Sequence, residues 1–81
     1  MKNQKLQDRI TVNPAVMVGK PTIRGLRITV EQILNALAAG ISEKELLEDY
    51  PELEKEDITA ALLYAADSLN NEQVFDLRLS A

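Results

Sequence analysis

Three cations lie in a short segment that is rich in turn-forming residues. Lys20, Arg24 and Arg27 fall within residues 19–27, together with two glycines and one proline. A sharply turning backbone can bring such side chains close to a polyanion, because Lys and Arg bind phosphate and Arg can donate two hydrogen bonds to guanine. We therefore expect a nucleic-acid-binding site at these three residues. Contact with a partner protein, or ion pairs with acids of the following helices, are the alternatives.

The charge of the chain is divided unevenly along its length. The net charge is −4 over 81 residues, but residues 1–30 carry +5 and residues 31–81 carry −9. Such a division indicates two surfaces with different partners. Alternatively, the two halves attract each other, within one chain or across a dimer.

Catalytic chemistry has little support in the composition. The chain has no His and no Cys, so it lacks the commonest general base, the commonest metal ligand and any thiol nucleophile. Ser42 and Ser68 have no His to activate them. We expect a protein that is not an enzyme and that uses no cofactor or metal. No apolar stretch reaches the length of a membrane span, and we expect a cytoplasmic protein without a signal peptide.

An acidic run follows the basic segment. Its spacing does not match that of an EF-hand loop, so we expect a solvated surface rather than a cation site. Such a surface could also steer a basic partner toward the protein. The acids of this run are Glu48, Asp49, Glu52, Glu54, Glu56 and Asp57.

Three short helices account for the hydrophobic pattern in the middle of the chain. Apolar residues recur at helical spacing over residues 30–39, 43–49 and 55–69. Gly40 follows the first helix and Pro51 follows the second, and both residue types commonly end helices. Three short helices joined by tight turns are typical of a helix-turn-helix domain.

The start of each helix carries a capping signal. Thr29 with Gln32, and Ser42 with Glu45, place a hydroxyl at the N-cap and an amide or carboxylate three residues later, which predicts two capping boxes. At the third helix the N-cap position holds Glu54, so we predict a weaker cap there.

The third helix is the one that usually reads DNA in such a domain, and here it lacks the residues for that role. Lys55 is the one cation on its predicted outer face, whereas base reading needs Arg, Lys, Asn or Gln. Leu63 and Tyr64 indicate a protein-binding patch, or else they complete the domain's own core. The buried face is predicted to hold Ile58, Ala61, Leu62, Ala65 and Leu69. The outer face is predicted to hold Lys55, Glu56, Asp57, Thr59, Ala60, Leu63, Tyr64 and Asp67.

Strand patterning appears on both sides of the helices. β-branched and apolar residues predict strands at 10–12, 22–24 and 26–28, the last two flanking Gly25. We expect these strands to form a hairpin-like element over residues 10–28.

The last residues of the chain form a tail with a pattern of its own. Within residues 70–81, Phe75, Leu77 and Leu79 lie on one side of an extended backbone, with Arg78 between them. Such a segment can add a strand to the sheet edge of a partner. The alternatives are a tail that packs on its own domain or frays.

One stretch of sequence resembles a known family. Residues 19–30, Gly-Lys-Pro-Thr-Ile-Arg-Gly-Leu-Arg-Ile-Thr-Val, are similar to the signature of the bacterial family called domain of unknown function 433. The resemblance continues through residues 49–51, Asp-Tyr-Pro, and covers residues 10–69. Leu26 and Glu54 depart from the family pattern, which usually has Thr at the first position and Ser or Thr at the second.

The resemblance implies a fold and a function. The fold would be mainly α: a homeodomain-like three-helix (helix-turn-helix) domain at residues 10–69 with a short N-terminal β element, preceded by a flexible arm at 1–9. The function would be that of an antitoxin of a type II toxin–antitoxin module, which binds a PIN-like ribonuclease toxin and its own operator DNA. We predict a homodimer with no membrane contact, whose partner-binding residues are Leu63, Tyr64, Phe75, Leu77, Arg78 and Leu79. A stand-alone DNA-binding transcriptional regulator and a β-mediated dimerisation module are the alternatives.

Overall fold

Three helices follow a small two-stranded sheet in the computed structural model, which describes residues 6–72. The elements in chain order are β1 (Ile10–Val12), η1 (Met17–Gly19), β2 (Pro21–Ile23), α2 (Val30–Ala38), α3 (Glu43–Asp49) and α4 (Lys55–Glu72). The prediction of a mainly helical fold with a short β element ahead of the helices is confirmed. Residues 1–5 of the predicted arm and residues 73–81 of the predicted tail lie outside the described residues.

The sheet is an antiparallel hairpin that pairs Ile10 with Ile23 and Thr11 with Thr22. β-branched side chains favour this extended backbone. The hydroxyl oxygens of Thr11 and Thr22 lie 3.1 Å apart, within hydrogen-bond distance. Because Ile23 is fully buried, the hairpin is fixed to the helices through its inner face.

The chain turns sharply directly after β2. The amide of Leu26 donates to the carbonyl of Ile23 at 2.7 Å, and φ is 47° at Arg24 and 75° at Gly25. Two successive positive φ angles are those of a type I′ turn, which glycine adopts without strain and arginine does not. The prediction of a strand over residues 26–28 is wrong. The turn brings the chain back beside β2, where the Ile23 amide donates to the Ile28 carbonyl at 3.0 Å and Thr22 forms an isolated bridge with Thr29, but residues 26–28 form no strand.

Both predicted capping boxes are present. The amide of Gln32 donates to the Thr29 hydroxyl at 2.9 Å, and the amide of Thr29 donates to the Gln32 side chain at 2.8 Å. Ser42 and Glu45 form the same reciprocal pair at 3.1 and 3.0 Å. Each box satisfies two backbone N–H groups that a helix start leaves without partners. This explains why α2 and α3 begin where the sequence predicts.

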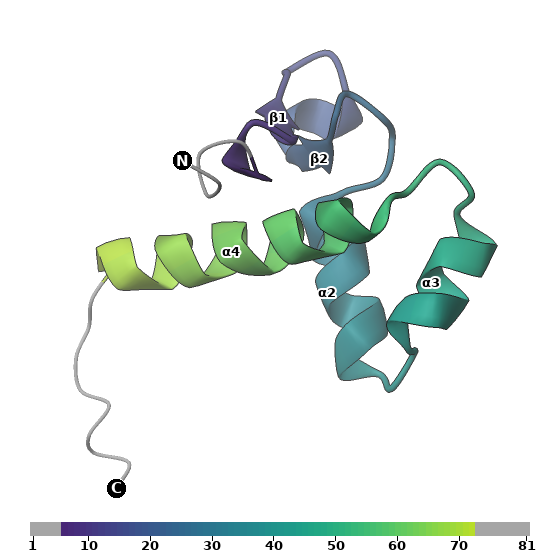
Figure 1. Ribbon diagram of the computed structural model, residues 1–81. Helices are drawn as coiled ribbons and strands as arrows, with labels where there is room; N and C mark the ends of the chain where they lie inside the picture. Colours follow the sequence, from purple (N-terminus) through teal and green to yellow (C-terminus); the bar gives the residue numbers. More distant parts are fainter. Residues whose placement is uncertain (1–5, 73–81) are drawn as a thin grey trace, which may run out of the picture.

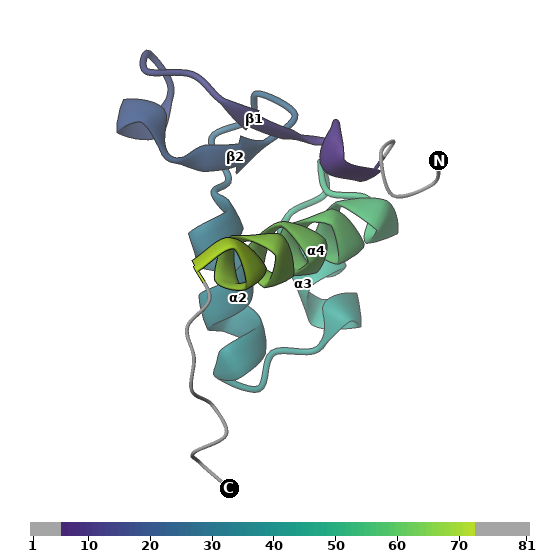
Figure 2. The same cartoon turned by 90° about the vertical axis from the view of Figure 1, so that its left-hand side faces the viewer.

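Helix α4 lies between the hairpin and the other two helices. Figure 1 and Figure 2 show β1 and β2 on one side of α4, with α2 and α3 on the other. The fully buried side chains of Ile23, Ile33, Leu46 and Ile58 come from β2, α2, α3 and α4, respectively. They meet in one hydrophobic core, so every major element contributes to the same buried cluster.

The buried face of α4 is rotated from the predicted one. Asp57 and Ala60, predicted to face outward, are fully buried, whereas Leu62 and Leu69, predicted to be buried, are 45% and 69% exposed. Two features explain the difference. The hairpin covers a side of α4 that a helix-only pattern leaves open, and the 18-residue α4 extends past the 9-residue α2 (Figure 1).

Candidate protein-binding surfaces

The central cation of the basic segment is held by a buried carboxylate. Arg24 donates from Nε to one oxygen of Asp57 at 3.0 Å and from Nη2 to the other at 2.8 Å. This two-point pairing is the strongest geometry between a guanidinium and a carboxylate. The side chain of Asp57 is fully buried, whereas 34% of the Arg24 side chain remains exposed.

A second arginine completes the surroundings of Asp57. Arg9 Nη1 lies 2.9 Å from an Asp57 oxygen and 2.8 Å from a Glu54 oxygen. The amide of Glu54 donates to Asp57 at 2.8 Å, which keeps half of a capping box at the start of α4. We call Arg9, Arg24, Glu54 and Asp57 the arginine clasp. Arg9 falls in the predicted arm, so the clasp ties the end of that segment, and the turn after β2, to α4.

The clasp keeps Asp57 ionised. Burial alone would raise the pKa of this carboxyl group, but hydrogen bonds from Arg24, the Glu54 amide and Arg9 outweigh it, so the pKa of Asp57 lies below its ordinary value. The pKa of Arg9 is raised by its hydrogen bonds to Glu54 and Asp57, and the pKa of Arg24 by its hydrogen bond to Asp57. The clasp is therefore a network of charges at neutral pH.

The other two cations of the basic segment lie apart from the clasp. Lys20 Nζ is 3.0 Å from a Glu31 oxygen, and both side chains are more than half exposed, so this pair adds little stability. Arg27 is exposed and forms no ion pair with any side chain of residues 6–70. Arg24 thus takes part in the internal pairing that was the alternative to nucleic-acid binding, while Arg27 stays open to solvent.

Exposed carboxylates lie on α3, in the loop that follows it and in the first turn of α4. The predicted acidic run is exposed at every position except Asp57, which the clasp buries. Lys44 and Lys55 are the cations of the same segment, so it is strongly negative overall. We call its exposed acids the acidic surface: Glu43, Glu45, Glu48, Asp49, Glu52, Glu54 and Glu56.

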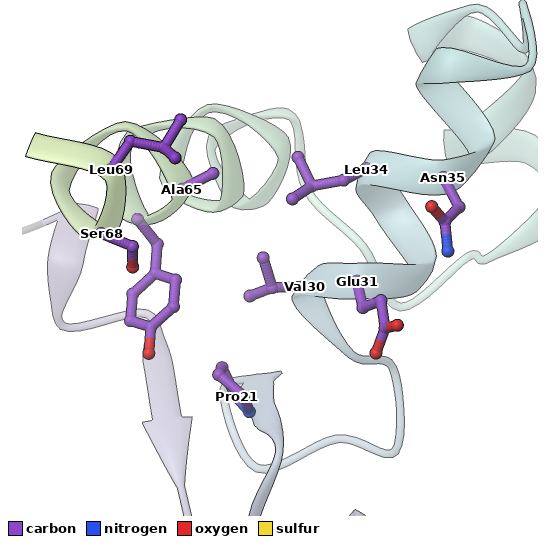
Figure 3. Close-up of a pocket in the computed structure, with 9 residues that line it drawn as sticks. Pro21, Val30, Glu31, Leu34, Asn35, Ala65, Ser68 and Leu69 are labelled. Atoms are coloured by element: carbon purple, nitrogen blue, oxygen red, sulfur yellow. The ribbon is translucent and has the colours of Figure 1, made fainter. Parts of the chain in front are cut away.

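An apolar groove of about 410 Å³ lies between α2 and the second half of α4. Val30 and Leu34 project into it from α2, and Ala65 and Leu69 border it on α4 (Figure 3). Tyr64 forms part of its wall. The sequence did not predict this groove, because Leu34 and Leu69 carry the same helical periodicity as the core residues.

The predicted partner-binding residues fall in different places. Tyr64 is half-buried in the wall of the groove, whereas Leu63 is half-buried on α4 and does not line the groove. The remaining predicted residues lie outside the described part of the chain: Phe75, Leu77, Arg78 and Leu79.

Within the described residues, no group of three His, Cys, Asp or Glu side chains is placed to hold a metal ion. In that same part of the chain, none of the helices combines the length and the apolar character that crossing a membrane requires.

Comparisons with known proteins place the chain in a family. The family model described as "Protein of unknown function (DUF433)" matches residues 10–65. The uncharacterized protein y4eO of Sinorhizobium fredii is 38% identical over 56 residues, which are 69% of this chain and 25% of that protein. A crystal structure of a DUF433 member protein from Anabaena variabilis shares 39% identity at a TM-score of 0.72, over 79% of this chain and 63% of that chain.

The chain therefore spans about a quarter of the length of the curated relative and less than two thirds of the solved one. The matched residues run from β1 into the second half of α4 and include the whole clasp except Arg9. On this match, and on the shared fold of the solved relative, the chain belongs to the DUF433 family.

Proposed function

We propose that this protein is a non-catalytic, antitoxin-like protein of the cytoplasm that binds a PIN-like ribonuclease toxin. The observation that carries the proposal is the acidic surface, whose seven carboxylates are all exposed. A ribonuclease acts on a polyanion, so its substrate-binding surface is expected to be basic. An acidic surface on a small partner can steer association with that surface and compete with RNA for it.

The tail supplies the second contact in this proposal. The alternating apolar residues of 75–79 suit addition of a strand to a sheet edge of the toxin. Arg78 would then neutralise the metal-binding carboxylates that PIN-like toxins are expected to carry. Leu63 and Tyr64 stay predicted contacts, and Tyr64 can be reached through the groove that it lines.

The clasp makes DNA a less favoured partner than the toxin. Arg9 and Arg24 are both bound to Asp57, which lowers the positive charge available for phosphates. If α4 read DNA as in a homeodomain-like helix-turn-helix domain, its start would bring Glu54 and Glu56 close to phosphates. One observation favours operator binding as a second function: Arg27 is exposed and unpaired among residues 6–70.

The proposal is tested by calorimetric titration of the protein with a purified PIN-like ribonuclease toxin. We expect saturable binding whose association weakens as salt rises, because charge steering is screened. Asp49→Lys should weaken binding by about fivefold or more, since it reverses a charge of the acidic surface. The matched control is Asp8→Lys, an Asp that is also exposed but lies outside that surface. Equal effects of the two variants, or no binding at all, would overturn the proposal.

A further inference from the structure

A second cavity, of about 500 Å³, lies beside the loop that leads from α3 into α4. Its volume is in the range of small-ligand sites. Two tight turns form its sides. One is the turn after β2, which contains Gly25. In the other, the amide of Leu53 donates to the carbonyl of Tyr50 at 2.9 Å, which places Glu52 within the turn. We call this space the turn cavity, and the residues that line it are Gly25, Leu26, Arg27, Ile28, Tyr50 and Glu52.

The arginine clasp connects the two turns. Arg24 Nη2 donates to the backbone carbonyl of Glu52 at 2.7 Å, in addition to the bonds that Arg24 makes to Asp57. Asp57 is fully buried, and Pro51 restricts the backbone of the second turn. Both sides of the turn cavity are therefore held in place before any ligand arrives, which lowers the entropic cost of binding.

The floor of the turn cavity is apolar. Ile28 belongs to the hydrophobic core, and Leu26 and Tyr50 are half-buried against that core. The side formed by Gly25 is open, because a Cβ atom added there would meet nothing within 4 Å apart from its neighbours in the chain. Such a surface suits an aliphatic or aromatic group of a ligand, whose removal from water is favourable.

Two side chains of opposite charge line the same cavity without binding each other. Arg27 and Glu52 are both exposed, and among residues 6–70 neither side chain takes part in an ion pair. A ligand that carries one anion and one cation can bind both side chains at once. A phosphate group suits the cavity less well, because the carboxylate of Glu52 repels it.

We propose that the turn cavity binds a free α-amino acid with an apolar side chain. The guanidinium of Arg27 binds the carboxylate of the ligand, and the carboxylate of Glu52 accepts hydrogen bonds from its ammonium group. The apolar side chain of the ligand lies on the floor, against Leu26, Ile28 and Tyr50. Both charges of an α-amino acid are attached to one carbon, so both can stay at the exposed rim while the side chain points inward. A residue inside a polypeptide carries neither charge and lacks these contacts.

The amino-acid site shares one residue with the acidic surface. Glu52 belongs to both, so a bound ammonium group neutralises one carboxylate of that surface. The proposal does not rest on toxin binding, because the site is complete within one chain and is measured on the protein alone.

Calorimetric titration of the full chain with L-leucine, and separately with L-phenylalanine, tests the proposal. We expect saturable binding of one ligand per chain for at least one of them. N-acetyl-L-leucine lacks the ammonium charge and L-leucinamide lacks the carboxylate charge, so each should bind at least about tenfold more weakly than L-leucine where L-leucine binds. The corresponding derivatives of L-phenylalanine serve where that amino acid binds. No binding of either amino acid at millimolar concentration, or equal binding of the derivatives, would overturn the proposal.

Variants of the two charged residues test where the ligand binds. Arg27→Gln and Glu52→Gln should each raise the dissociation constant of the amino acid by about tenfold or more. The matched controls are Lys44→Gln and Asp8→Asn, which remove charges of the same signs at exposed positions that do not line the cavity. The controls should change the dissociation constant by less than about twofold, because distant exposed charges are screened. Equal effects of variants and controls would overturn the proposal, as would an Arg27→Gln protein that loses affinity for duplex DNA but not for the amino acid.

Discussion

The carboxylate of Asp57 at the start of α4 and the guanidinium of Arg24 at the turn after β2 form a two-point ion pair, at 3.0 and 2.8 Å. The two residues lie 33 positions apart in the sequence. Their pairing joins the hairpin to the helices beside the buried contact of Ile23 with the core. The clasp therefore has a structural role that can be measured without any partner.

Loss of the buried charge should destabilise the domain strongly. Asp57→Asn leaves Arg24 without its anion and Arg9 with Glu54 alone, and breaking a buried pair in this way costs about 3 kcal/mol. That is a large share of the roughly 5–15 kcal/mol available to a domain. Urea unfolding, monitored by circular dichroism, gives the difference in unfolding free energy between the natural protein and the variant. The control is Glu56→Gln, an exposed neighbour that should change the unfolding free energy by less than about 0.5 kcal/mol. Similar losses of unfolding free energy in the two variants would show that the clasp does not stabilise the domain.

Stability should fall in acid through Asp57. The pKa of Asp57 is depressed in the folded state, so the folded protein binds fewer protons than the unfolded chain, whose Asp pKa is about 3.9. The stabilisation is present above that unfolded value and is lost as the pH falls through the folded pKa. We expect the unfolding free energy of the natural protein to drop more steeply than that of Asp57→Asn between about pH 5 and pH 2. Parallel slopes for the two proteins would show that Asp57 does not titrate in this way.

Substitutions of Arg24 and of Arg27 should have different effects: the first should lower stability, and the second should weaken any binding to nucleic acid. Arg24→Ala removes one arm of the clasp and should lower the unfolding free energy by about 2 kcal/mol, since hydrogen bonds to charged groups are worth about 1.5–3 kcal/mol. Arg27→Ala should leave the unfolding free energy within about 0.5 kcal/mol, because Arg27 is exposed. If the protein binds duplex DNA, Arg27→Ala should weaken that binding without unfolding the domain. Equal destabilisation by the two variants would contradict this division.

The N-cap of α3 should contribute measurably to the free energy of unfolding. Ser42→Ala removes the hydroxyl that accepts from the amide of Glu45 at 3.1 Å. We expect a loss of about 1 kcal/mol, the usual value for an N-cap serine. Ser68→Ala is a matched control within α4, where alanine is the better helix former. Thermal unfolding of the two variants gives the comparison, and no loss in Ser42→Ala would show that the capping box is not stabilising.

Local signals in the sequence are sufficient to predict the helices. The capping boxes at Thr29 and Ser42 identified where α2 and α3 begin, because a cap is made by residues three positions apart. The hairpin could be predicted at Ile10–Val12 for the same reason, since β-branched residues favour strands locally. The strand expected at residues 26–28 does not form, because after the turn at Arg24 and Gly25 the chain returns to β2 through a single isolated bridge, between Thr22 and Thr29.

The clasp and the groove could not be predicted from local patterns. Asp57 occupies a position that suits a solvated helix start, and its burial depends on Arg24 and Arg9, which lie 33 and 48 residues away. The exposure of Leu62 and Leu69 depends on the relative lengths of α2 and α4, because among the described residues the shorter α2 does not extend along the whole of α4. An acid three residues after the N-cap position, directly before the apolar residues of the helix, is the sequence signal for such a capping contact.

Paired titrations of the protein with a purified PIN-like ribonuclease toxin and with duplex DNA from its own promoter test the central claim most directly. Binding to the ribonuclease that weakens in Asp49→Lys and is kept in Asp8→Lys is the result predicted by a protein-binding acidic surface. The contradictory result is no binding to the ribonuclease, together with DNA binding that falls steeply with salt and is abolished by Arg24→Ala in a protein that remains folded.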